Sequence, residues 1–229
     1  WAPLMTGALP DNWDAKRPVV EGMPVATRNA FGKVLNALAP TVPGLVGGSA
    51  DLEPSNKTKI DGSPYFQADA PEGRNFHFGV REHAMGAIAN GMTVHGGLMP
   101  YCATFLVFSD YMRTPIRLAA LSSFPTIFVF SHDSIGLGED GPTHQPIEQT
   151  MSLRLIPSLE VIRPADANET AAALRCAILN RDHPTALLTT RQNVPVLPAA
   201  QAVQGVARGA YVLQEAEGGA PDVILIGAG

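Results

Sequence analysis

Apolar residues along the chain alternate between short continuous runs and the spacing of a helix. Phe31, Val34, Leu35 and Leu38 recur at intervals that place them on one face of a helix. Residues 126–131 (TIFVFS) form a continuous β-branched and aromatic run, which is typical of a strand buried on both faces. Both patterns occur again further along the chain, so we expect several elements of each kind.

Strands are predicted at residues 45–48, at 100–104 as an edge strand, at 159–162 and at 186–190. Helices are predicted from Met85 to Met92, from the end of that edge strand through Leu121, at 144–154 and at 166–180. Because strands separated by helices form parallel pairs, we expect an α/β fold. Its sheet is mostly parallel, and helices cover both faces.

The two ends of the chain carry a different pattern. Residues 1–24 hold four prolines and no sustained period, so they are expected to form a linker. Residues 25–200 are expected to form one domain. Residues 201–229 are expected to form a second linker that leads into the first strand of a further domain at 223–227 (VILIG). These boundaries predict a fragment of a longer protein.

Composition narrows the class of protein. Apolar residues make up 45% of the 229 residues, enough for a sizeable core, which excludes a mainly disordered chain. The net charge of −5 argues against a nucleic-acid partner, because such proteins normally carry a basic face. No apolar run approaches the roughly 20 residues of a membrane span, and the N-terminus lacks a signal-peptide pattern. Cys102 and Cys176 fit no disulfide framework. We therefore expect a cytoplasmic globular protein without a membrane partner.

The loop after the 126–131 strand is the densest in polar side chains. Ligands of parallel α/β sheets bind at the carboxyl ends of the strands, so chemistry is expected here. Three glycines fit the G-x-G-x-x-G dinucleotide pattern: Gly136, Gly138 and Gly141. Glu139 and Asp140, however, would place negative charge where the phosphates must bind. The glycines are better explained as tight turns that present His132, Asp140 and His144, and a metal site at these residues is the alternative.

Glu82 precedes a run of small and apolar residues, 84–89. A glutamate in the first turn of a helix also interacts with the helix dipole, which is the purely structural interpretation. A carboxylate in apolar surroundings nevertheless needs a partner, and a protonated ligand nitrogen would be one.

Aromatic and cationic residues form two further candidate groups. Phe105, Phe108 and Tyr111 are spaced to lie on one side of a helix, either as core or as a wall on which a flat ring stacks. Arg28 and Arg191 lie near expected element ends, where a guanidinium either binds phosphate or forms a surface ion pair.

Six segments in a fixed order carry a resemblance to a known family: 26–28 (ATR), 47–52 (GGSADL), 79–86 (GVREHAMG), 132–146 (HDSIGLGEDGPTHQP), 163–166 (RPAD) and 190–195 (TRQNVP). The chain closely resembles the transketolase family over roughly residues 24–195, specifically its middle, pyrimidine-binding domain. The resemblance implies an enzyme that depends on thiamine diphosphate. It would transfer a two-carbon ketol unit from a ketose phosphate to an aldose phosphate, as in the pentose phosphate or Calvin pathways.

The resemblance also assigns residues. Glu82 would bond the cofactor's aminopyrimidine and so favour the tautomer that removes the thiazolium proton to form a carbanion. The implied catalytic residues are Glu82, His132 and His144. The implied cofactor-binding residues are Asp51, Glu82, Phe105, Phe108 and Tyr111. The implied substrate-binding residues are Arg28, Ser55, His132, Asp140, His144 and Arg191.

In the family, a separate N-terminal domain binds the diphosphate and its Mg²⁺ or Ca²⁺ through a Gly-Asp-Gly element, which this sequence lacks. The resemblance therefore implies a homodimer with a composite active site, and an isolated fragment without activity. A dihydroxyacetone synthase, which uses formaldehyde as acceptor, is the alternative enzyme. A dimerising fragment without catalysis and a nicotinamide-dependent oxidoreductase are the alternatives of other classes.

Overall fold

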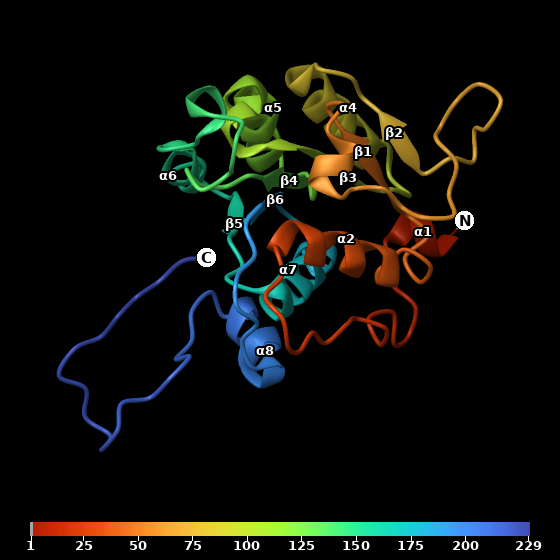
Figure 1. The fold of residues 1–229 in the computed structure, drawn as a ribbon. Helices are drawn as coiled ribbons and strands as arrows, with labels where there is room; N and C mark the ends of the chain where they lie inside the picture. The colour runs from red at the N-terminus through yellow and green to blue at the C-terminus, as the bar shows by residue number, and fades with distance from the viewer. Residues whose placement is uncertain (1) are drawn as a thin grey trace.

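The computed structural model describes residues 2–229 and is built around one six-stranded sheet (Figure 1). The strands are β1 (Leu45–Ser49), β2 (Asn75–His77), β3 (Met99–Phe105), β4 (Ile127–Ser131), β5 (Glu160–Ile162) and β6 (Thr185–Thr189). They lie in the order β2-β1-β3-β4-β6-β5, and every neighbouring pair is parallel. The predicted α/β fold is confirmed.

Helices cover both faces of this sheet, as predicted. They are α1 (Ala2–Thr6), α2 (Thr27–Leu38), α3 (Glu53–Asn56), α4 (Glu82–His95), α5 (Ser109–Leu121), α6 (Gln149–Arg154), α7 (Ala167–Leu179) and α8 (Ala202–Ala207). Short 3₁₀ helices span Leu106–Phe108, Pro142–His144 and Ala199–Gln201. Helices α2 and α7 pack on one face, and α4 and α5 pack on the other (Figure 1).

The core consists of two apolar layers, one on each face of the sheet. In β4, Val129 points toward α2 and α7, whereas Phe128 and Phe130 point toward α4 and α5. All three side chains are fully buried. Helix α2 contributes Val34 and Leu35, which are fully buried as their spacing predicts. A strand covered on both faces requires apolar residues at consecutive positions, which explains the continuous run in β4.

Two predicted elements differ from the structure. The strand at residues 100–104 is not an edge strand, because β3 lies between β1 and β4. Pro100 is tolerated there because it lies next to the first residue of the strand. The helix predicted at 144–154 begins only at Gln149. Pro146 disfavours helical backbone at the preceding residue, and Gln145 is accordingly extended.

Residues 223–227, predicted as the first strand of a further domain, pair with no strand among the described residues, and that assignment stays a prediction. Leu225 and Ile226 are 92% and 93% exposed. At the other end, the predicted linker starts at Trp1, which lies outside the described residues. Its later part packs on the domain: Trp13 is buried, and its carbonyl accepts a hydrogen bond from Thr41 Oγ1 at 2.7 Å. The proposed division into linkers and domains stays a prediction.

Candidate active site

The predicted site residues gather at the carboxyl edge of the sheet. Strands β3, β4 and β6 end in register, with Phe105 beside Ser131 and Ser131 beside Thr189. His132 directly follows β4, Arg191 follows β6, and Phe105 is the last residue of β3. Because the carboxyl ends of parallel strands meet at one edge, residues far apart in sequence come together there.

Glu82 is the first residue of α4 and is only 7% exposed. Its carboxylate makes one hydrogen bond within residues 2–229, accepted by Oε1 from Thr104 Oγ1 at 3.3 Å. One turn further along, a Cβ on Gly86 would approach Met112 and Pro115 to 2.9 Å, so α4 and α5 are in close contact. The predicted burial of the carboxylate is therefore observed, and the carboxylate retains capacity to accept further hydrogen bonds.

The aromatic residues form a stack, but not along one helix as the spacing predicted. Phe105 ends β3, Phe108 lies in a 3₁₀ turn, and Tyr111 lies in α5. Ring centroids are 6.1 Å apart between the first two and 6.0 Å apart between the last two. Phe105 is buried, whereas Tyr111 is 66% exposed, so the stack runs from the core to the surface.

Two histidines of the predicted site pack against this stack. The His132 ring stacks on Phe105 with 3.7 Å between centroids, and His144 meets Phe108 edge-on at 5.2 Å. Thr143 Oγ1 lies 2.7 Å from Nδ1 of His144. The histidines therefore connect the aromatic stack to the polar part of the site.

His132 is held in an unusual conformation. Its φ of 58° lies in the left-handed region, which costs about 1–3 kcal/mol for a residue other than glycine. Ser131 Oγ lies 2.8 Å from its Nδ1 and accepts a hydrogen bond from Asn56 Nδ2 at 2.7 Å. The serine hydroxyl can therefore donate its hydrogen to Nδ1, and with that bond direction the imidazole proton lies on Nε2.

Burial and the positive charge of Arg28 lower the pKa of His132 to about 4. The ring is therefore neutral at pH 7 and donates through one nitrogen. Asn56 and Ser131 were not among the predicted site residues. The sequence signal that could have found Asn56 is its place directly after Ser55.

Two arginines create a positive region beside His132. Nη1 of Arg28 donates to the carbonyl of Ser55 at 3.0 Å, so Ser55 contacts it through the backbone. Burial and then the charge of Arg191 lower the pKa of Arg28, and Asp140 partly opposes this effect. Nε of Arg28 is buried and has no hydrogen-bond partner in the part of the chain that is described. Such free guanidinium donors suit an anionic ligand.

Asp51 and Asp140 are the two exposed carboxylates of the predicted site. Asp51 lies two residues after β1 with a φ of 56°, another left-handed position. Neither carboxylate has a hydrogen bond to a residue within 2–229. Both residues follow strands at the carboxyl edge of the sheet, and both side chains are exposed to solvent.

The glycines of the 131–146 loop allow close approach to the loop after β6. A Cβ on Gly136 would lie 2.6 Å from Gln192 Oε1, and a Cβ on Gly138 would overlap the guanidinium of Arg191. The glycine run does not open an α-helix: the short 3₁₀ helix Pro142–His144 follows it, and α6 begins only at Gln149. This geometry explains the glycines without a bound dinucleotide, whose phosphates require a helix N-terminus.

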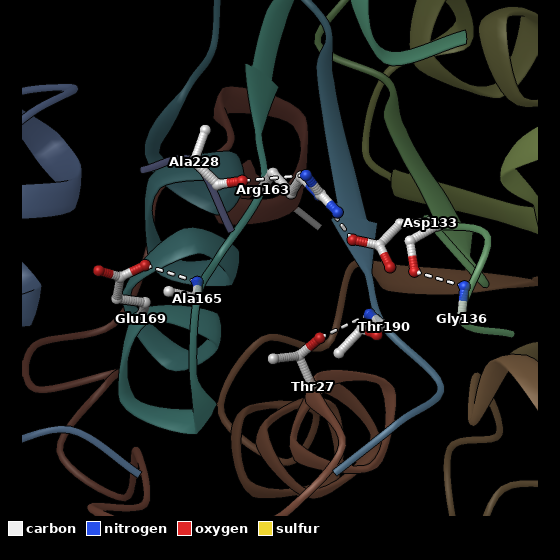
Figure 2. A network of polar contacts seen from close by, with 9 residues as sticks. Thr27, Asp133, Gly136, Arg163, Ala165, Glu169, Thr190 and Ala228 are labelled. Atoms are coloured by element: carbon white, nitrogen blue, oxygen red, sulfur yellow. Dashed lines mark hydrogen bonds and ion pairs between the residues drawn. The ribbon is translucent and has the colours of Figure 1, made fainter. Parts of the chain in front are cut away.

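Figure 2 shows the polar contacts that anchor this region. Arg163 Nε lies 2.7 Å from the buried Asp133 carboxylate, and its Nη1 donates to the carbonyl of Ala228 at 3.0 Å. Thr190 N–H donates to Thr27 Oγ1 at 2.7 Å. The loop that carries His132 is therefore tied to the end of β5, and the loop after β6 is tied to α2.

No group of three or more His, Cys, Asp or Glu side chains within residues 2–229 could hold a metal ion. None of the described helices is long and apolar enough to cross a membrane.

Residues 23–196 match the family model described as "Transketolase, pyrimidine binding domain". The chain is 58% identical over 226 residues to a transketolase of Geobacillus stearothermophilus, covering 97% of this chain and 34% of that protein. It superimposes on the transketolase of Pichia stipitis in complex with sedoheptulose 7-phosphate with a TM-score of 0.90 and 46% identity. That match covers 94% of this chain and 33% of the other.

A split-gene transketolase, described as an inactive β4 tetramer, matches with a TM-score of 0.59 and 29% identity over 77% of this chain and 54% of its own. The chain thus spans about a third of the length of the curated relatives it matches. The match over residues 23–196 and the high identity agree with the geometry of the carboxyl edge, and the chain belongs to the transketolase family through its pyrimidine-binding domain.

Proposed function

We propose that the protein transfers a two-carbon ketol unit between sugar phosphates with thiamine diphosphate as cofactor. The observation that carries the proposal is the buried Glu82 carboxylate beside an aromatic stack, at the same sheet edge as Arg28, Arg191 and His132. A carboxylate next to flat rings suits a protonated heteroaromatic ligand, and clustered cations suit a phosphate.

The residues present fit the pyrimidine end of thiamine diphosphate. Glu82 hydrogen-bonds to Thr104, the residue directly before Phe105, so the carboxylate lies next to the ring stack. One carboxylate oxygen has no partner within residues 2–229 and can accept a hydrogen bond from a ring nitrogen. When bound, the cofactor supplies the nucleophilic carbon and the electron sink of the reaction.

The side chains of this chain hold and orient the reactants. Glu82 stabilises a proton on the ligand's ring nitrogen, because the buried carboxylate has little water to compete with it. Phe105, Phe108 and Tyr111 provide the surface on which the ring rests. Asp51, on the loop after β1, lines the cofactor side of the pocket in this proposal.

The polar side of the site binds the sugar. Arg28 and Arg191 bind its phosphate through guanidinium donors, together with the backbone region of Ser55. Neutral His132 donates from Nε2 to the sugar phosphate. The implied partners of the sugar hydroxyls near the reacting carbons are Asp140 and His144.

We propose that a second polypeptide region completes the site. The matched family model covers the pyrimidine-binding domain alone, so a separate domain would hold the diphosphate and its Mg²⁺ or Ca²⁺. In a homodimer, that domain of one subunit faces the pyrimidine-binding domain of the other. The chain by itself would then dimerise without catalysing, and the name of the related inactive split-gene tetramer supports this view.

The test is an assay of the full-length protein with thiamine diphosphate and Mg²⁺. Xylulose 5-phosphate is the donor, and ribose 5-phosphate or formaldehyde is the acceptor. Formation of glyceraldehyde 3-phosphate with ribose 5-phosphate supports transketolase activity. Product with formaldehyde alone would favour dihydroxyacetone synthase, and no product with either acceptor would contradict ketol transfer. Nucleotide binding without thiamine diphosphate binding would instead favour an oxidoreductase.

A further inference from the structure

We propose that Thr27 and Thr190 are positioning residues. Together they hold Arg28 and Arg191 as a preformed phosphate-binding pair, and so set the preference for phosphorylated over non-phosphorylated sugars. The inference rests on the proposed function, because it deepens the role of the same site. Neither threonine contacts the sugar in this proposal, and both act through the arginine that follows them.

The two threonines join α2 to the loop after β6. Thr190 N–H donates to Thr27 Oγ1 at 2.7 Å, and Arg28 N–H donates to the carbonyl of Thr190 at 3.3 Å (Figure 2 shows the first bond). These bonds run in opposite directions between two pairs of adjacent residues, Thr27-Arg28 and Thr190-Arg191. We call this pair of bonds the threonine clamp. It fixes the backbone of both arginines across a separation of 163 residues.

Burial makes the threonine clamp hard to replace. Thr27 is fully buried and Thr190 is 8% exposed, so water cannot readily take the place of a lost partner. The Arg28 N–H belongs to the first turn of α2, where backbone donors have no acceptor within the helix. The residue before the helix, Ala26, offers no side-chain cap. The carbonyl of Thr190 therefore acts as the acceptor that the helix start lacks.

The clamp works against electrostatic repulsion. Arg28 and Arg191 carry like charges that repel each other. The charge of Arg191 lowers the pKa of Arg28, and both charges lower the pKa of the neighbouring His132. Within residues 2–229, Arg28 has no carboxylate partner, and the partner of Arg191 is Glu139, which is 85% exposed. Such an exposed pair contributes little. A phosphate dianion would relieve the repulsion and satisfy the free donors of both side chains.

The experiment uses the full-length protein and two donors that differ only in the phosphate, xylulose 5-phosphate and xylulose, with glycolaldehyde as acceptor. Thr27→Val removes the hydroxyl at nearly constant shape. We expect the KM for xylulose 5-phosphate to rise about tenfold, the effect of losing a buried hydrogen bond. The KM for xylulose should change less than about twofold, and inhibition by inorganic phosphate should weaken by the same factor as the first KM.

Two variants accompany this one. Thr27→Ser restores the hydroxyl and should restore the KM for xylulose 5-phosphate. Thr58→Val is the matched control, because Thr58 is also fully buried and its hydroxyl has no partner within the described chain. Thr27→Ala serves as the second variant if Thr27→Val does not fold.

An equal change for both donors, or unchanged inhibition by phosphate, would overturn the proposal. A wild-type protein that uses neither donor would contradict the proposed function instead. In that case calorimetric binding of inorganic phosphate still tests the clamp, because the wild type should bind it about tenfold more tightly than Thr27→Val.

Discussion

The two ends of the candidate site handle charge in opposite ways. At the cofactor end, one carboxylate, Glu82, lies buried among apolar and aromatic groups with a single hydrogen bond from Thr104. At the phosphate end, Arg28 and Arg191 lie beside each other and beside neutral His132. One end holds an isolated negative charge, and the other gathers positive charges whose ion-pair partner within residues 2–229 is the exposed Glu139.

The difference indicates which kind of ligand would stabilise each end. A buried carboxylate is stabilised by a ligand that brings a proton, so the cofactor end suits a flat, protonated ring. Clustered guanidinium groups are stabilised by a ligand that brings negative charge, so the phosphate end suits an anion. The structure supports each end differently: close helix packing at Gly86 at the first, and backbone clamps and ion pairs at the second.

The largest expected effect is a loss of kcat caused by a substitution at the cofactor end. Glu82→Gln keeps the shape of the side chain but removes its charge, so kcat of the full-length protein should fall about 10³-fold. The KM for xylulose 5-phosphate should stay within about threefold, because the phosphate end is untouched. Steady-state kinetics at saturating cofactor measure both values. Glu72→Gln, at an exposed position, is the control, and an undiminished kcat for Glu82→Gln would remove the carboxylate from the mechanism.

The next effect concerns the support of the phosphate end. Arg163→Ala leaves the Asp133 carboxylate, which is 4% exposed, without its ion-pair partner. The free energy of unfolding of the chain should fall by about 2 kcal/mol, less than for a fully buried pair because Arg163 is 26% exposed. Urea unfolding measures the change. Glu139→Gln disrupts the exposed Arg191 pair and should cost less than about 0.5 kcal/mol. Equal effects of both variants would mean that burial does not distinguish the pairs.

A pH effect of similar or smaller size follows from His132. Its pKa is lowered to about 4, whereas the unfolded histidine titrates near 6.5. Between these values the unfolded chain binds the proton more strongly, so stability decreases as the pH falls from 6.5 to 4. The contribution of His132 is about 2 kcal/mol after allowance for solvent screening. In His132→Gln the fall should be shallower by that amount, whereas exposed His95→Gln should follow the wild type. Parallel stability curves for His132→Gln and the wild type would contradict the lowered pKa.

The smallest expected effect on stability lies at the outer end of the aromatic stack. Tyr111 is 66% exposed, so Tyr111→Ala should change the free energy of unfolding by less than about 0.5 kcal/mol. Its ring should still matter for the cofactor, and the concentration of thiamine diphosphate that gives half-maximal activity should rise about fivefold. Phe105→Ala, in contrast, should destabilise the chain strongly because that ring is buried. A large loss of stability in Tyr111→Ala would mean that this ring belongs to the core.

All strands of the sheet except β2, and most of the longer helices, could be predicted because their signals are local. The period of Phe31, Val34 and Leu35 and the continuous run of β4 depend only on near neighbours in sequence. A prediction differed from the structure where strand pairing, which the local sequence does not record, sets the position of a strand in the sheet. The strand at 100–104, predicted at an edge, lies between β1 and β4 because of the order of the sheet.

The identity of the chemical groups was also readable from the sequence, since Glu82, His132 and the arginines carry motifs of the transketolase family. Only the tertiary structure decided how they meet. Asn56 reaches Ser131 across 75 residues, and Thr27 reaches Thr190 across 163. No local period records such contacts, because they follow from which strands are neighbours. The sequence determined the elements and the chemical groups, and the sheet order determined which of these groups meet and what supports them.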